Sequence, residues 1–294
     1  MDLKRDLFLG LVTYPESKYK DYNGSNLNFI ELVNFLEVSN YQINNKNYII
    51  DSSFKKMDLS TYAKNSFSLI VNMLSILLVK FYSIKNINLL TLSRSTLNDS
   101  IVIFKIIHRT IVYFLTLGKS KKLNTDIIRQ TNISCSHRDL IQKAFESGCK
   151  WALILEDDFI FDRSNNFKSK IQFCLKVMTE NPYLVMTNIS KSFSIKQMGI
   201  EGIINKKLQN LAHPGDEFVT LNHPITNTLC STIYDVRQLQ CIHNELKKLG
   251  IYSHIPVDHQ LNIVLWNLVK KRVFSRSCYS SYFPGIFIQG SLCE

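Results

Sequence analysis

The sequence contains no C-x-x-C pair, no proline-, serine- or glycine-rich tract and no internal repeat. Its seven cysteines are an odd number, which argues against a complete disulfide framework. No signal peptide is visible at the N-terminus, because Asp2, Lys4, Arg5 and Asp6 precede a short apolar run. We therefore expect a reducing, cytoplasmic compartment, and the 294 residues fit one large domain or two small ones.

Acidic residues are nearly absent between residues 60 and 124, where Asp99 stands against nine lysines and arginines. This quarter of the chain supplies most of the net charge of +11. A basic segment attracts nucleic acid, phospholipid or phosphorylated ligands.

The same segment contains two apolar runs, 67–79 and 101–117, bounded or interrupted by basic residues. The uncharged part of the first is shorter than the roughly 18–20 residues that a membrane span needs. The second contains Lys105, His108 and Arg109, which are costly at a bilayer centre. Three interpretations stay open: two helices packed on the domain, a basic face on a membrane surface, or a true span.

Outside this segment, short apolar runs alternate with helical spacing of apolar residues. Ser136 and Asp139 form an S-x-x-D pattern that predicts a helix start, and Gly148 predicts its end. The order of helices and strands from there implies a parallel sheet with right-handed crossovers. Strands are expected at 7–13, 151–156, 183–188, 230–234 and 286–289, with helices at 29–36, 136–147, 167–178, 236–249 and from 256.

Three successive acids, Glu156, Asp157 and Asp158, end the apolar run WALILE. In an α/β sheet the carboxyl end of a strand is where ligands bind. Like charges repel, and a hard cation such as Mg²⁺ or Mn²⁺ would relieve the repulsion through carboxylate oxygens. The triplet therefore predicts a metal-bridged diphosphate, against the alternative of a solvated acidic loop.

The run SHRDLIQKAFESGCKWALILEDD resembles lipopolysaccharide-type glycosyltransferases of family 25, in which a Ser-His-led helix precedes a strand ending in an acidic metal motif. The resemblance is strong over 133–160 and covers about half of the chain. Weaker matches follow in order at 228–234, at Pro256-Val257-Asp258-His259 and at 283–291, and the N-terminal LGLVTYPES loosely resembles the first nucleotide-binding strand. Residues 60–124 match nothing in that family.

The resemblance implies a GT-A (Rossmann-like) α/β fold with a mixed, mostly parallel sheet, flanking helices and a basic helical insert. It also implies a nucleotide-sugar donor, with a UDP-sugar favoured, and Mn²⁺ or Mg²⁺ as cofactor. By this analogy Asp158 binds the metal, and Glu156 faces the metal, its bound water or the donor's ribose. Asp157 supports both, and His137 lies near the donor. The triplet departs from the commoner D-x-D form by placing Glu first.

The resemblance also implies inverting transfer, which needs a base for the acceptor hydroxyl. Our candidate is Asp258, with a helix-capping role as the alternative. Ser17 is a candidate contact to the nucleotide, or an ordinary turn residue. Gln289 and Ser291 are candidate contacts to the diphosphate at the end of the sequence.

We divide the chain into 1–59 (first part of the nucleotide-binding domain), 60–124 (the basic insert) and 125–294 (the remainder of the catalytic domain). The predicted acceptor is a glycan or a lipid-linked precursor, and the insert is a candidate for peripheral contact with the inner face of the membrane.

A metal-dependent phosphoester hydrolase or nuclease is the alternative, although such sites usually draw acids from several strands and nucleic acid is not the expected partner. A non-enzymatic binding protein is a third possibility.

Overall fold

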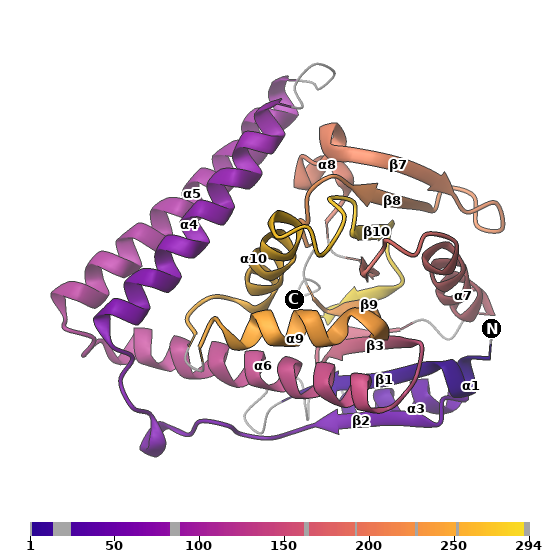
Figure 1. Ribbon diagram of the computed structural model, residues 1–294, viewed down its shortest axis with the longest axis horizontal. Helices are drawn as coiled ribbons and strands as arrows, with labels where there is room; N and C mark the ends of the chain where they lie inside the picture. The colour runs from indigo at the N-terminus through magenta and orange to yellow at the C-terminus, as the bar shows by residue number, and fades with distance from the viewer. Residues whose placement is uncertain are drawn as a thin grey trace.

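The computed structural model describes residues 2–13, 25–82, 89–161, 165–191, 193–226, 229–250 and 253–290. A large sheet crosses the molecule, with helices on both of its faces (Figure 1). Its strand order is β2-β1-β3-β9-β5-β10-β8-β7. The strands are β1 Leu7–Val12, β2 Asn40–Asn44, β3 Trp151–Glu156, β5 Met186–Asn188, β7 Ile204–Gln209, β8 Glu217–Leu221, β9 Ser231–Asp235 and β10 Tyr279–Phe283.

The sheet is mixed, as predicted: six of the eight strands in the described part of the chain run in one direction, and β8 and β9 run in the opposite direction. β1 pairs in parallel with β2 and β3, and β5 pairs in parallel with β10. β9 lies antiparallel between β3 and β5, and β8 lies antiparallel to β10 and β7. The stretch between Gln209 and Glu217 is too short for the crossover that a parallel neighbour needs, so β7 and β8 form an antiparallel pair.

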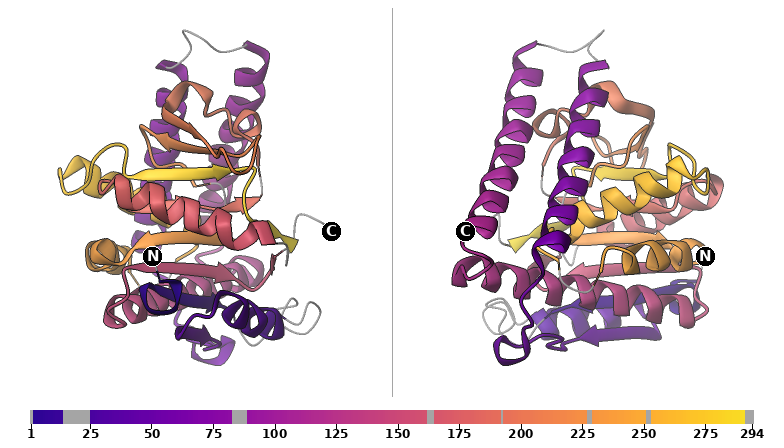
Figure 2. Two further views of the ribbon diagram at one scale, coloured as in Figure 1. Left: turned by 90° about the vertical axis from the view of Figure 1, so that its right-hand side faces the viewer. Right: turned by 60° about the vertical axis from the view of Figure 1, so that its left-hand side comes forward.

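Helices cover both faces of the sheet (Figure 2). A hydrophobic core lies on each face. Side chains of β3 alternate between them: Ala152 and Ile154 face one core, and Leu153 and Leu155 face the other. The first core is covered by α6 Lys121–Glu146, α9 Leu239–Lys247 and α10 Val257–Lys270, and the second by α3 Ser25–Leu36 and α7 Asn165–Glu180. Shorter helices are α1 Leu3–Asp6, α8 Ile195–Met198 and the 3₁₀ turns η1 Asp51–Ser53, η3 Glu201–Ile203 and η4 Val236–Gln238.

Helix α6 begins fifteen residues before the predicted start at Ser136, so that prediction is wrong. Ser120 is its N-cap and accepts from the backbone N–H of Leu123. Leu123 and Ile127 are buried one turn apart, so the apolar face of α6 continues towards the N-terminus. The helix therefore crosses position 124, where we placed the end of the basic insert. The predicted end is confirmed, since Gly148 adopts φ +70° directly after the helix.

Two long helices, α4 Leu59–Tyr82 and α5 Leu89–Leu115, pack against each other and rise beside the sheet (Figure 1). Leu69, Met73 and Ile106 join the first core, so the pair is packed on the α/β domain. Tyr62 stacks on Tyr113 at 3.9 Å between ring centroids, which ties the lower ends of the two helices together. By length and composition the stretch Leu59–Lys80 is apolar enough to cross a membrane, a property that it shares with buried helices of soluble proteins.

A small second sheet brings the end of the sequence to the end of β3. Its strands are β4 Phe159–Ile160, β11 Phe287–Gln289 and β6 Ser190–Lys191, in the order β4-β11-β6. β11 is antiparallel to β4, with Gln289 opposite Phe159. The predicted strand at 286–289 is therefore confirmed, and its pairing places it directly after the acidic triplet.

Candidate active site

The acidic triplet lies at the edge of the large sheet where β1 and β3 end together. The parallel register pairs Val12 with Glu156, so Thr13 comes beside Asp157. Thr13 Oγ1 donates a hydrogen bond to Asp157 Oδ2 at 3.2 Å, and both residues are buried. On the other side, the backbone N–H of Glu156 donates to the carbonyl of Cys230 at 3.0 Å. Glu156 ends β3, and Asp157 and Asp158 form a buried turn between β3 and β4, so the triplet is not a solvated loop.

The end of the sequence closes a second side of this site. The backbone N–H of Gly290 donates to the carbonyl of Asp158 at 2.6 Å. Gln289, a predicted diphosphate contact, is therefore held beside the triplet through its backbone. Ser17 and Ser291, the other two predicted contacts in these segments, lie outside the described residues.

His137 reaches the triplet from helix α6. Its Nε2 lies 3.1 Å from Glu156 Oε1, with the imidazole 2% exposed and the carboxylate 22% exposed. His137 Nδ1 is buried and has no hydrogen-bond partner among the described residues. A neutral imidazole with its proton on Nε2 donates to the carboxylate and fixes its orientation. His137 was expected near the donor, and in the structure it contacts Glu156 directly.

The next residue on this helix, Arg138, points elsewhere. Its guanidinium is buried and donates from Nη2 to the carbonyl of Gly250 at 2.7 Å. Burial lowers the pKa of this guanidinium from its ordinary value. Arg138 therefore fastens α6 to the segment after α9.

The negative charge of the triplet acts on two buried neighbours, Cys230 directly before β9 and Tyr234 on β9. Burial raises the pKa of the Cys230 thiol well above its ordinary value, and the charges of Asp158, Glu156 and Asp157 raise it further. Burial and then the charge of Glu156 likewise raise the pKa of the Tyr234 phenol. Both side chains are neutral near pH 7, so the negative charge at this edge comes from the carboxylates.

Asp258 is the second residue of α10, in the first turn after the N-cap Pro256. Its Oδ1 accepts from the backbone N–H of His259 at 2.8 Å, and Thr226 Oγ1 donates to its carbonyl at 3.4 Å. The carboxylate contact satisfies one of the free N–H groups of the helix start, as the capping interpretation requires. The role of Asp258 as a base stays a prediction.

The donor set fits a hard cation bound together with a substrate. Among the described residues no three His, Cys, Asp or Glu side chains form a cluster that could hold a metal by themselves. Mg²⁺ usually binds through one or two carboxylates together with substrate phosphates and water, so Glu156 and Asp158 match its donor chemistry.

The sequence analysis did not name Thr13 as a site residue. Its place as a polar residue directly after the first buried strand could have indicated that it lies at this edge of the sheet.

These features define an α/β protein with a carboxylate site at the carboxyl edge of a mixed sheet. Residues 119–228 match the family model of glycosyltransferase family 25 (LPS biosynthesis protein). The match confirms the resemblance to a family 25-like glycosyltransferase and supports a transferase enzyme. It spans α6 and the strands through β8, and includes His137 and the triplet. No curated protein matches the chain.

Proposed function

We propose that the protein transfers a sugar from a nucleotide-sugar, a UDP-sugar, to a hydroxyl of a glycan or lipid-linked acceptor. The observation that carries this proposal is the meeting of three segments at one edge: Thr13 after β1, the triplet after β3, and Gly290 after β11. Such an edge holds ligands in α/β sheets. The family 25 match over 119–228 supports the same reaction class.

In this proposal Asp158 and Glu156 hold Mn²⁺ or Mg²⁺ together with the donor diphosphate. The cation would stabilise the negative charge of the departing nucleoside diphosphate. Thr13 holds Asp157 in place, and His137 holds Glu156 with one of its two carboxylate oxygens engaged. The carboxylates of Glu156 and Asp157 are thereby held in place before the cation arrives.

The reaction we propose is inverting. The acceptor oxygen forms a bond to the anomeric carbon as the bond from that carbon to the diphosphate breaks, and the acceptor proton passes to Asp258. A carboxylate is a competent general base for this step once it lies within hydrogen-bond reach of the acceptor. In the same proposal, residues 1–59 and 125–294 form the catalytic α/β domain, and 60–124 form its basic helical insert.

The test is a screen of UDP-, GDP- and CMP-sugars for Mn²⁺-dependent thermal stabilisation and for transfer or donor hydrolysis. A ligand that binds the native state raises the melting temperature, and at a given concentration a tighter ligand raises it more. We expect stabilisation by a UDP-sugar with Mn²⁺ in wild type and in Glu146→Gln, which removes an exposed acid at the end of α6, and none in Asp158→Asn. Full stabilisation and activity in Asp158→Asn would contradict the metal assignment.

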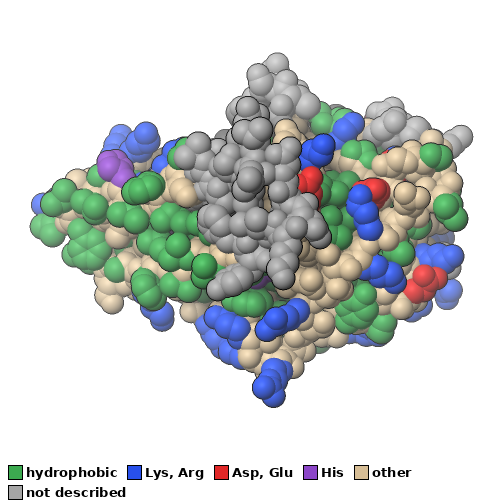
Figure 3. Space-filling view, turned by 90° about the horizontal axis from the view of Figure 1, so that it is seen from above, with side chains coloured by type: hydrophobic (Ala, Val, Ile, Leu, Met, Phe, Trp, Pro, Cys, Tyr) green, Lys and Arg blue, Asp and Glu red, His purple; other side chains and the backbone are tan. Residues whose placement is uncertain are grey.

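We also propose peripheral contact between the α4–α5 pair and the inner face of an anionic membrane. Four large apolar side chains on α4, spaced four, three and four residues apart, are exposed, and four on α5 follow the same helical spacing. They are Phe67, Val71, Leu74 and Leu78 on α4, and Phe104, Ile107, Ile111 and Phe114 on α5, which we call the outer face. Figure 3 shows a broad hydrophobic area there.

The charge near the outer face supports a lipid surface as its occupant. Lys64 lies within the exposed stripe of α4, and Lys119, Lys121 and Lys122 are exposed where α5 ends and α6 begins. Anionic lipids attract such lysines, and apolar side chains between them insert at the headgroup boundary. A membrane position would bring the enzyme to a lipid-linked acceptor.

A further inference from the structure

A cavity lies between helix α5 and the start of α10, outside the edge that carries the acidic triplet. Its volume is about 150 Å³, and it is lined by Leu69, Val102, Lys105, Ile106, Arg109, His254, Pro256 and His259. A cavity of about this volume holds a group the size of benzene, so a phosphoryl group fits it and a whole nucleotide does not. None of the lining residues is acidic.

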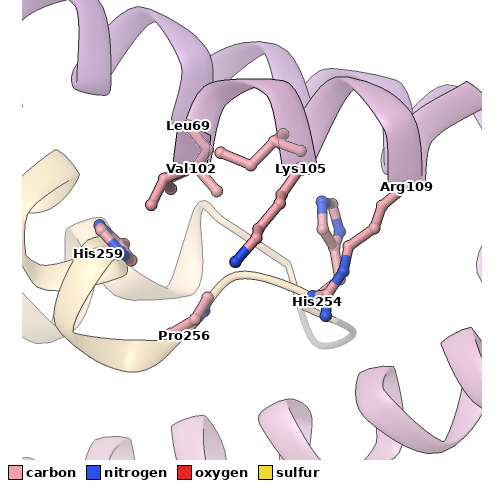
Figure 4. Close-up of a pocket in the computed structure, with 8 residues that line it drawn as sticks. Leu69, Val102, Lys105, Arg109, His254, Pro256 and His259 are labelled. Carbon is pink, nitrogen blue, oxygen red and sulfur yellow. The ribbon is translucent and has the colours of Figure 1, made fainter. Parts of the chain in front are cut away.

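The two cations of this cavity come from one face of α5. Lys105 and Arg109 lie one turn apart, and Figure 4 shows Lys105 extending towards Pro256 and His259 while Arg109 extends towards His254. Arg109 also contacts Asp126 of α6, at 3.7 Å between Nη2 and Oδ2. That single, half-exposed carboxylate leaves an excess of positive charge at the cavity.

Two imidazoles complete the lining. His254 stacks on Tyr62 with ring centroids 4.0 Å apart, and its Nε2 lies 3.0 Å from Ser66 Oγ. The Nδ1 atoms of His254 and His259 are buried and have no hydrogen-bond partner among the described residues. A buried ring nitrogen without a partner is costly unless a ligand or water satisfies it. The ring of His254 is fixed by its stacking and by Ser66, so its Nδ1 cannot easily turn to solvent.

These groups match a tetrahedral oxyanion better than a planar one. A carboxylate can be satisfied by the guanidinium fork alone, whereas a phosphoryl group has three oxygens that accept from several donors at once. Lysine ammonium and arginine guanidinium both bind phosphate well. The apolar wall of Leu69, Val102 and Ile106 suits the carbon atoms that the phosphate esterifies.

We propose that this cavity binds a phosphoryl group of a phosphate ester. Its position at the start of α10 places the phosphate near the segment that carries Asp258, the predicted base: Asp258 does not line the cavity itself, but Pro256 lies two residues before it and His259 directly after it. The ester is therefore assigned to the acceptor and not to the donor. This last assignment rests on the proposed transferase function, whereas phosphoryl binding itself does not.

The experiment measures binding without any donor sugar or metal. Glycerol phosphate is titrated into wild type, Lys105→Gln and Lys206→Gln, with glycerol as the neutral ligand. Lys206→Gln makes the same change of charge at an exposed position on β7, outside the cavity and the outer face. We expect Lys105→Gln to weaken glycerol phosphate binding by about tenfold, the usual effect of losing a charge-assisted hydrogen bond, and Lys206→Gln to bind as wild type does.

A second measurement locates the ligand in the wild-type chain. The ring-proton NMR signals of His254 and His259, assigned with His254→Gln and His259→Gln, are expected to shift on addition of glycerol phosphate, and that of His108 is expected to stay. Equal binding by Lys105→Gln and Lys206→Gln to both glycerol phosphate and the phosphatidate vesicles described below would overturn the proposal, as would glycerol phosphate binding that leaves both histidine signals unmoved. Such a failure would leave UDP-sugar binding in wild type intact, so it is distinguishable from failure of the transferase function.

A parallel titration with vesicles containing phosphatidate separates two sources of the phosphoryl group. Binding that depends on Lys105 with glycerol phosphate indicates that a soluble phosphate ester is sufficient. Binding that depends on Lys105 with phosphatidate vesicles alone indicates a lipid headgroup. Both outcomes support the cavity as a phosphoryl site, and binding that is independent of Lys105 in both titrations rejects it.

Discussion

His137 Nε2 lies 3.1 Å from Glu156 Oε1, although the two residues belong to different elements and are nineteen positions apart. The contact joins the middle of α6 to the last residue of β3. Because the imidazole is almost fully buried, it has little freedom to leave the carboxylate. His137 is therefore a positioning residue for the first acid of the triplet.

Replacing His137 tests this relationship. His137→Ala removes the donor that orients Glu156, and we expect the apparent Mn²⁺ affinity and kcat/KM of sugar transfer to fall by about 10- to 100-fold, as for other partners of metal ligands. His137→Gln can still donate from its amide and is expected to retain part of the activity. The measurement is transfer as a function of Mn²⁺ concentration.

His108→Gln is the matched control for the histidine change, since His108 is exposed on α5. A purely structural role for His137 would lower stability without changing the Mn²⁺ dependence. Melting temperatures measured beside the kinetics separate these outcomes, and an unchanged Mn²⁺ profile in His137→Ala would remove the positioning role.

The Thr13–Asp157 hydrogen bond gives a second prediction. Thr13→Val keeps the side-chain shape and removes the hydroxyl that donates to the buried carboxylate. A hydrogen bond to a charged group contributes about 1.5–3 kcal/mol, so we expect the loss to raise KM for the donor by about tenfold or more. Thr125→Val, on an exposed part of α6, serves as the control. Equal KM values in the two variants would show that Thr13 does not support the triplet.

The elements of the α/β domain were predictable where their signals are local. β3 is a buried apolar run ended by charge, α7 has regular apolar spacing, and α6 ends at a glycine with positive φ. The order of the strands was not predictable in the same way. The sequence of β9 does not indicate that this strand lies between β3 and β5, because strand pairing depends on contacts between segments far apart in the chain.

The site was predictable in part for the same reason. The triplet is a local pattern, and the family resemblance pointed to His137, but the contact between His137 and Glu156 depends on how α6 packs over the sheet. The outer face was also hidden, because α4 is apolar on most of its circumference. Phe67 and Leu69 look alike in sequence, yet Phe67 is 68% exposed and Leu69 is 3% exposed.

The outer face predicts a change in membrane binding. Phe67→Gln with Leu78→Gln replaces two exposed apolar side chains on α4. A buried phenylalanine or leucine contributes about 1.5–3 kcal/mol, so each change is expected to weaken binding to vesicles with anionic lipid by about tenfold or more. Flotation with the vesicles measures this. Leu211→Gln, which alters an exposed leucine far from α4 in sequence, is expected to bind as wild type does, and equal flotation of all variants would exclude the outer face.

The small sheet that carries β11 predicts a stability effect at Gly285. This glycine has φ +101°, and a Cβ there would lie 2.5 Å from the backbone carbonyl carbon and oxygen of Ser190. Gly285→Ala must therefore shift β11 away from β6, in addition to a backbone strain of about 1–3 kcal/mol. We expect a lower free energy of unfolding in urea and weaker donor binding, because β11 holds Gly290 against Asp158.

Gly215→Ala is the control for the backbone strain at Gly285. Gly215 has φ +92°, but nothing lies within 4 Å of a Cβ built there. It therefore reports the cost of the positive φ alone. The steric argument requires Gly285→Ala to be the more destabilised variant, and equal urea midpoints would contradict it.

The last prediction concerns acid stability. His223 is buried against Trp266, with ring centroids 4.3 Å apart, and burial lowers its pKa to about 4. In the unfolded chain a histidine titrates near pH 6.5, so between pH 6.5 and pH 4 the unfolded state binds a proton that the folded state does not. The stabilising contribution of the neutral imidazole is therefore complete above pH 6.5. It is lost as the pH falls towards 4, by at most about 1.4 kcal/mol per pH unit.

The free energy of unfolding in urea, measured from pH 7 to pH 4, is expected to fall less steeply in His223→Gln than in wild type. The exposed-site variant His108→Gln is expected to follow wild type, and parallel curves for His223→Gln and wild type would show that His223 is not buried in its neutral form.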